Sequence, residues 1–208
     1  MKTVQCAVTA RASFVEIAPS SPVTLGGSGL PDTLVTSVAD PPEANIVILE
    51  DKDTVIVFVT FDLLYVGHDL RRMIEERLAI NLSPARLFLA ASHTHRAPML
   101  DGSKPELGQL SQAALNETAD RVVEAVVELL NSHGRLVSVD VSYGEHSAGV
   151  NRRKHRPLHI GRQGIRLNAI NLAPNPEGPI DPRVRRLRFI EESGDVMAEL
   201  WSTSLHPT

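Results

Sequence analysis

The stretch "ANIVILEDKDTVIVFVTFDLL", residues 44–64, decides the fold class. It holds two runs of mostly β-branched apolar residues on either side of the polar segment "EDKD". Such runs are typical of strands that are buried on both faces, and a short charged connection joins two of them as a hairpin. We therefore expect strands at 46–50 and 55–61.

Other elements are expected on both sides of this hairpin. The spacing of apolar residues predicts helices at 68–80 and 109–132. Apolar runs and alternation predict a strand within the first 17 residues and further strands at 86–91, 135–143, 184–190 and 196–204. Because strands and helices alternate early and hairpins lie toward both ends, the fold class is α/β, with mixed β-sheets covered by helices in a single domain.

Residues 145–182 show little periodicity and are rich in Arg, His, Asn, Pro and Gly. We expect a long connection there, and connections of that length often serve function. Its basic side chains are suited to bind an anionic group of a substrate. Solvated charge on a loop is the simpler interpretation.

Composition excludes several classes of protein. The chain has 208 residues, 42% of them apolar, and a net charge of −4, which gives no reason to expect a nucleic-acid partner. No apolar stretch approaches the roughly 20 residues of a membrane span. The single cysteine, Cys6, fits a reducing compartment, and no signal peptide is evident at the N-terminus, so we expect a cytoplasmic location.

Candidate metal ligands lie in "LFLAASHTHRAPMLDG", residues 87–102. His93 and His95 follow an apolar strand and are two positions apart, so in an extended segment their rings would face the same way. A third histidine, His206, ends the last apolar strand and is also followed by proline. Imidazole nitrogens that converge in this way suit Zn²⁺. The alternative is a polar strand end with exposed or hydrogen-bonded histidines.

A carboxylate ends the preceding strand. Asp62 suits either of two roles: it can support a ligating imidazole, or it can fix the start of a neighbouring element. The second role is the commoner one for such a residue.

Five segments, in order, resemble the neutral/alkaline non-lysosomal ceramidases. "SHTHRAP" (92–98) is similar to their Thr-His-Thr-His-Ser-Gly-Pro motif, and "GVNRR" (149–153) to their Asn-Arg-Ser segment. The other three are "FVEIAPSSPVTLGG" (14–27), "VIVFVTFDLLYVGHDLRRMIEERL" (55–78) and "GPIDPRVRRLRFIEESGDVMAELWSTSLHPT" (178–208). Together they span nearly the whole chain.

This resemblance implies specific roles. It implies that residues 1–208 are the N-terminal part of a ceramidase-like catalytic domain, and that His93 and His206 bind zinc. It also implies that His95 and Arg152 line the catalytic site. The expected activity is zinc-dependent hydrolysis of an N-acyl, ceramide-like small-molecule or lipid substrate.

Two departures from the family pattern leave alternatives open. Arg96 and Ala97 replace the small Ser-Gly pair, and "MLDGSKPELG" (99–108) replaces a glycine-rich run. The family's remaining zinc ligands, a glutamate and a tyrosine, have no matching positions here. We therefore expect an incomplete site with zinc partly bound or absent, in a fragment or a short relative. The second hypothesis is a metal-binding or structural domain without catalysis, and a homo-oligomer is compatible with both.

Overall fold

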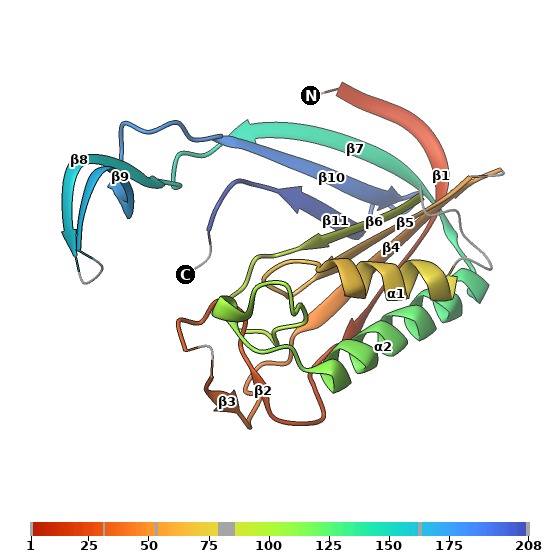
Figure 1. Ribbon diagram of the computed structural model, residues 1–208. Coiled ribbons are helices and arrows are strands. Elements are labelled where there is room, and N and C mark those ends of the chain that lie inside the picture. The colour runs from red at the N-terminus through yellow and green to blue at the C-terminus, as the bar shows by residue number, and fades with distance from the viewer. Residues whose placement is uncertain (1, 31, 53, 79–85, 162–163, 207–208) are drawn as a thin grey trace.

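The computed structural model describes residues 2–30, 32–52, 54–78, 86–161 and 164–206. Its main feature is a seven-stranded sheet in the order β11-β10-β7-β1-β4-β5-β6 (Figure 1). The strands are β1 (Lys2–Glu16), β4 (Glu43–Asp51), β5 (Thr54–Phe61), β6 (Leu87–Ala91), β7 (Arg135–Glu145), β10 (Arg183–Glu191) and β11 (Val196–Ser202). Neighbours pair antiparallel except β5 and β6, which are parallel.

The two helices connect strands of this sheet. Helix α1 (His68–Leu78) forms the crossover that makes β5 and β6 parallel, and α2 (Gln112–Asn131) leads from the region after β6 to β7. The mixed sheet, the predicted strands and both helices confirm the α/β class. Positions 79 and 80 of the first predicted helix lie outside the described residues. Helix α2 starts later than expected because Ser111 is its N-cap and accepts a hydrogen bond from the Ala114 backbone N–H.

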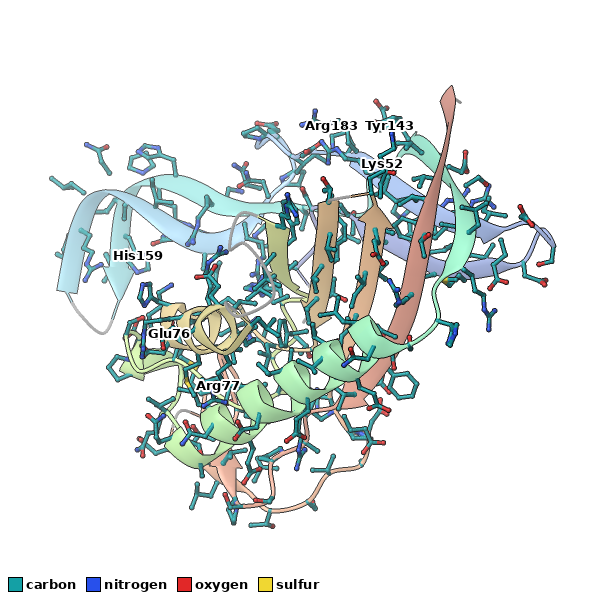
Figure 2. The ribbon with its side chains drawn as sticks, turned by 90° about the vertical axis from the view of Figure 1, so that its right-hand side faces the viewer. Lys52, Glu76, Arg77, Tyr143, His159 and Arg183 are labelled. Atoms are coloured by element: carbon teal, nitrogen blue, oxygen red, sulfur yellow. The ribbon has the colours of Figure 1, made fainter. Side chains whose placement is uncertain are left out.

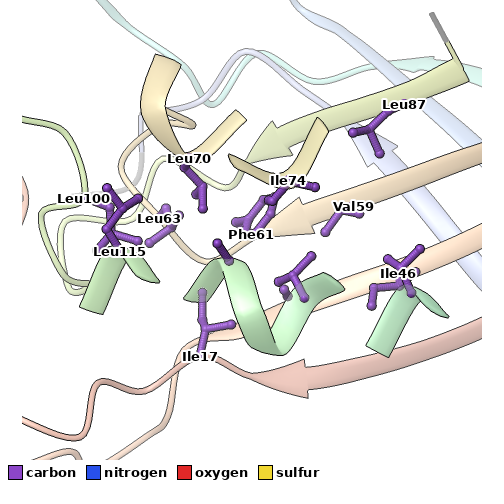
Figure 3. Close-up of a cluster of buried hydrophobic side chains, with 14 of the residues drawn as sticks. Ile17, Ile46, Val59, Phe61, Leu63, Leu70, Ile74, Leu87, Leu100 and Leu115 are labelled. Carbon is purple, nitrogen blue, oxygen red and sulfur yellow. The ribbon is translucent and has the colours of Figure 1, made fainter. Parts of the chain in front are cut away.

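Both helices cover one face of the sheet. Ile46 and Val59 on the central strands, Leu70 and Ile74 on α1, and Leu115 on α2 are almost fully buried in one cluster (Figure 3). Neighbours of Ile46 in the strand point to the opposite face, as the two-residue period requires. This cluster packs both helices against the sheet.

A second core lies on the opposite face. Ala10, Val47, Val137 and Phe189 are buried there. Side chains from β4 and β5 at one end of the strand order and from β11 at the other end pack against this same cluster. The sheet is therefore curled, and its β11 edge folds back over the central strands (Figure 1).

The expectation of an irregular connection at 145–182 is wrong. Strands β8 (Asn151–Gly161) and β9 (Gly164–Asn175) form a two-stranded antiparallel sheet of their own, which projects from the body (Figure 1). Aliphatic and polar residues alternate in "GIRLNAINL" (164–172), a strand signal that the surrounding Arg, Asn and Pro hide. Pro157 is tolerated because each strand of a two-stranded ribbon has an unpaired edge.

Shorter elements complete the fold. Strands β2 (Val23–Thr24) and β3 (Leu34–Val35) pair with each other, and η2 (Pro105–Leu107) is a single 3₁₀ turn. In the part of the chain that the structure describes, no helix is both long and apolar enough to cross a membrane.

Candidate metal centre

His93 and His95 lie in the turn directly after β6. The Ser92 backbone N–H still donates to the Phe61 carbonyl at 2.9 Å, as in the parallel ladder. His93 then adopts a left-handed conformation with φ of 63°. The two histidines converge, but through this turn and not through the extended alternation expected from the sequence. A non-glycine residue in that conformation is uncommon, and such residues are concentrated at functional sites.

Backbone carbonyls fix both rings. His93 Nδ1 donates to the Leu64 carbonyl at 2.7 Å, and His95 Nδ1 donates to the Gly27 carbonyl at 2.6 Å. Because a carbonyl oxygen only accepts, Nδ1 carries the proton in each neutral ring. Each Nε2 therefore has a lone pair, as in histidines that bind metals.

His206 joins the pair from the other edge of the sheet. Its ring centroid lies 4.7 Å from that of His93 and 4.9 Å from that of His95, and the His93 and His95 centroids are 5.4 Å apart. The prediction that His93 and His206 lie close together is confirmed. The strands that precede the two histidines are not neighbours, because β6 and β11 are opposite edges of the sheet that the curl brings together.

The three histidines fit a metal ion. One nitrogen from each ring lies within 4.8 Å of the others. Simultaneous Zn–N bonds of about 2.0 to 2.1 Å need separations of about 3 to 4 Å, so small ring movements suffice. His95 Nε2 is buried and has no hydrogen-bond partner among the described residues. A buried polar atom left unpaired costs about 1–3 kcal/mol, which a bound ligand would offset.

Arg152, the second residue of β8, approaches the cluster from the start of the β8–β9 ribbon. Arg152, Asp181 and His206 line a cavity of about 520 Å³. Partial loss of hydration lowers the pKa of His206, and the charges of Arg152, His93 and His95 lower it further, although the residue as a whole is exposed. A lower pKa keeps the imidazole neutral, which is the form that binds metals.

Asp62 does not orient the histidines. Its carboxylate accepts a hydrogen bond from the Glu43 backbone N–H at 3.3 Å and so fixes the start of β4. The orienting groups that sequence reasoning missed are the carbonyls of Gly27 and Leu64. Every residue has a backbone carbonyl, so residue type does not show which carbonyls face a histidine. The sequence feature that could have pointed to this segment is the "GG" at 26–27.

The segment that carries Gly27 is held in place by the backbone. Gly26 N–H donates to the Ala97 carbonyl at 2.9 Å, and Gly27 N–H donates to the Leu107 carbonyl at 2.6 Å. Gly27 has φ of 69°, and a side chain there would meet His95 Nδ1 at 2.8 Å. Glycine is therefore required both by the conformation and by the close approach of the ring.

A second cavity, of about 600 Å³, lies beside the histidine turn. Thr94, Arg96 and Pro98 line it on one side, and the segments 19–23 and 35–42 supply most of the rest. Thr94 and Arg96 flank His95 in the chain, but the residues that line this cavity include none of the three histidines. Its volume is within the usual range for a small-molecule site.

The fold has known counterparts among ceramidases. The chain is similar to neutral ceramidase from Pseudomonas aeruginosa, with a TM-score of 0.74 and 16% sequence identity, covering 98% of this chain and 32% of that one. It is also similar to a ceramidase complexed with C2, with a TM-score of 0.71 and 17% identity at the same coverage. No protein-family model and no curated protein matches the sequence. The structure is thus a partial neutral-ceramidase-like fold, which spans about a third of the length of these ceramidase chains.

Proposed function

We propose that this chain carries part of the active site of a zinc-dependent amide hydrolase that acts on an N-acyl, ceramide-like substrate. In this proposal residues 1–208 are the N-terminal part of a ceramidase-like catalytic domain. His93 and His206 are zinc ligands, and His95 and Arg152 contact the substrate. The observation that carries the proposal is the convergence of three imidazoles from opposite edges of a sheet, two of them with their tautomers fixed by carbonyls.

Each proposed role follows from the chemistry of the side chain. His93 offers Nε2 because Leu64 holds its Nδ1 proton. Zinc bound at such a site would lower the pKa of a coordinated water to about 7 and polarise an amide carbonyl. His95 Nε2, buried and unpartnered, is positioned to accept a proton from a reacting group. The Arg152 guanidinium would stabilise negative charge that develops on the amide oxygen.

The cavity beside the histidine turn is the proposed site for the substrate. Val23, Leu25, Val35 and several prolines supply the apolar part of its lining, which an acyl chain could contact, and the rest of the lining is polar. Arg96 lies at its border and is exposed. In this proposal the apolar part of an N-acyl substrate occupies this cavity, beside the segment that carries His95.

The second candidate function is metal binding without catalysis. Within the described residues the cluster of potential ligands consists of three histidines and includes no carboxylate. With His93 and His206 as the ligands and His95 kept for the substrate, the ion would have two protein ligands, whereas hydrolytic zinc sites have three and keep a fourth position open for water. We therefore expect the isolated chain to bind zinc weakly and to hydrolyse amides slowly.

Zinc content and turnover separate these functions. The purified chain would be titrated with zinc, its metal content measured after gel filtration, and its activity assayed on a ceramide and a simple N-acyl substrate. Zinc binding with turnover supports the hydrolase, and zinc binding without turnover supports the second function. His93→Ala should abolish zinc binding, whereas His155→Ala, an exposed position on β8, should leave it unchanged. Equal losses in the two variants would refute the assigned site.

A further inference from the structure

The β8–β9 ribbon presents aliphatic side chains to solvent. Leu158 lies opposite Leu167, and Ile160 lies opposite Ile165, so these two cross-strand pairs share one face of the ribbon near its tip. All four side chains are between 53% and 75% exposed. An exposed cluster of large aliphatic residues usually marks a surface that binds something. An isolated two-stranded ribbon is also only marginally stable in water, so contact with another phase or molecule would stabilise it.

The same ribbon is strongly basic. Residues 146–176 contain six Arg or Lys and no Asp or Glu, although the whole chain has a net charge of −4. Arg153, Lys154 and Arg156 are exposed, and none of them forms an ion pair within the described residues. Within the described residues, these three positive charges therefore have no carboxylate that neutralises them.

We propose that the β8–β9 ribbon docks this protein onto an anionic lipid surface. The aliphatic face near the tip enters the boundary between headgroups and acyl chains, and the basic side chains nearer the root bind the headgroup phosphates and carboxylates. This combination of an apolar face with Lys and Arg is typical of segments that lie at a membrane interface. Protein interfaces concentrate Trp and Tyr at their centres, and residues 146–176 contain neither.

The position of the ribbon connects docking to the candidate site. Arg152, at the start of β8, lines the same cavity as His206, so a membrane bound by the tip would lie on the side of the molecule from which Arg152 enters the site. Figure 2 shows the ribbon, with His159 on it, well away from Lys52 at the turn between β4 and β5. Lys52 is exposed and therefore provides a matched control for removal of positive charge.

Vesicle flotation tests the proposal. The chain would be mixed with vesicles of phosphatidylcholine alone or with roughly one-third phosphatidylserine, at about 0.1 M and about 1 M salt. We expect binding to the anionic vesicles at low salt, and at least roughly tenfold weaker binding to the neutral vesicles and at high salt. Lys154→Gln with Arg156→Gln should weaken binding by about thirtyfold, because each basic side chain near the surface contributes about fivefold.

Two further variants test the apolar part. Ile160→Ser with Ile165→Ser should reduce binding roughly tenfold or more, because two fewer aliphatic side chains would be buried in the membrane interface. Phe14→Ser on β1, another exposed apolar position, and Lys52→Gln should leave binding unchanged. Circular dichroism spectra and melting temperatures would be recorded to establish that every variant is folded.

Several results would overturn the proposal. These are no binding to anionic vesicles, equal binding to both kinds of vesicle, and equal losses in the ribbon and control variants. Light scattering that shows dimers dissociated by Ile160→Ser with Ile165→Ser would assign the face to self-association instead. The docking proposal is independent of the metal centre: His93→Ala should lose zinc and still bind vesicles, whereas the ribbon variants should lose vesicle binding and retain zinc.

Discussion

Two backbone carbonyls set the chemistry of the histidine pair. By accepting the Nδ1 protons of His93 and His95, Leu64 and Gly27 leave both Nε2 lone pairs available. Hydrogen bonds of this kind orient metal-binding imidazoles, and their removal typically lowers metal affinity 10- to 100-fold. The conformation of Gly27 is thus as important to the candidate site as the histidine that it holds.

Replacing Gly27 by Ala tests this dependence. The new Cβ would lie 2.8 Å from His95 Nδ1, so the ring must move. We expect zinc affinity to fall roughly 10- to 100-fold, together with a loss of about 1–2 kcal/mol in stability from the left-handed backbone. Isothermal titration with zinc and thermal melts would measure the two effects.

Gly29→Ala is the matched control. Gly29 has φ of 80°, and a Cβ there would meet nothing within 4 Å. This variant should show a similar loss of stability with unchanged zinc affinity. If both variants lose zinc equally, backbone strain and not the contact with His95 is responsible.

The carboxylate of Asp181, which lines the same cavity as His206, gives a prediction about how stability depends on pH. Hydrogen bonds from Arg183, at 2.7 Å from Nε and 2.9 Å from Nη2, lower the pKa of Asp181 to about 2. Since the pKa is lower in the folded state, the stabilisation is complete above about pH 4 and is lost as the pH falls toward 2. Carboxyl titration followed by NMR should show Asp181 near 2, and Arg183→Gln should return it toward about 3.9. An unshifted Asp181 in the unmodified chain would show that these two hydrogen bonds do not form in solution.

At the scale of elements, β7 and β10 are joined by a buried ion pair. Asp140 and Arg188 are opposite each other in the register, and Arg188 Nη2 lies 2.7 Å from Asp140 Oδ2. Asp140 is 3% exposed, and its Oδ1 has no hydrogen-bond partner among the described residues. The carboxylate therefore depends on this one guanidinium.

Removing the guanidinium should destabilise the fold. Arg188→Ala would leave a buried, unpaired charge, and we expect a loss of about 3–5 kcal/mol in the free energy of unfolding, measured with urea. Arg135→Ala breaks an exposed pair with Glu191 and should cost no more than about 1 kcal/mol. Asp140→Asn in the Arg188→Ala background should restore part of the stability, because the buried group is then neutral. Similar losses in the two single variants would show that the Asp140 carboxylate reaches water.

For the whole molecule, the curl of the sheet determines whether the histidines meet. Phe189 on β10 is fully buried in the cluster that also contacts side chains of β4, β5 and β11. That cluster holds the β11 edge over the central strands. The segment that carries His206 follows β11, and its position relative to His93 therefore depends on this packing.

Phe189→Ala should accordingly weaken the metal centre from a distance. We expect a loss of about 3–5 kcal/mol in stability and roughly tenfold weaker zinc binding, because the two edges separate. Ile74→Ala, in the core under the helices, should cost about 2–5 kcal/mol and leave zinc affinity unchanged. Zinc titrations at low temperature, where both variants are folded, would compare them. Equal affinities would mean that the curl does not position His206.

The sequence by itself determined the elements and the first half of the candidate site. Hydrophobic period distinguishes strand from helix locally, so the hairpin at 44–64, a helix within 109–132 and the position of His93 and His95 after an apolar strand were all predictable. The hydrophobic period did not predict the two strands at 151–175. Both faces of that ribbon are exposed, so no core imposes a burial pattern on every residue.

Only the tertiary structure decided how distant residues meet. The strand order places β6 and β11 at opposite edges, and no local pattern encodes the curl that brings His206 to His93. The curl results from side chains of four or more strands packing in one cluster, which is a property of the assembled sheet. The same holds for the carbonyls of Leu64 and Gly27, because every residue has a carbonyl and only the folded chain selects which ones face a histidine.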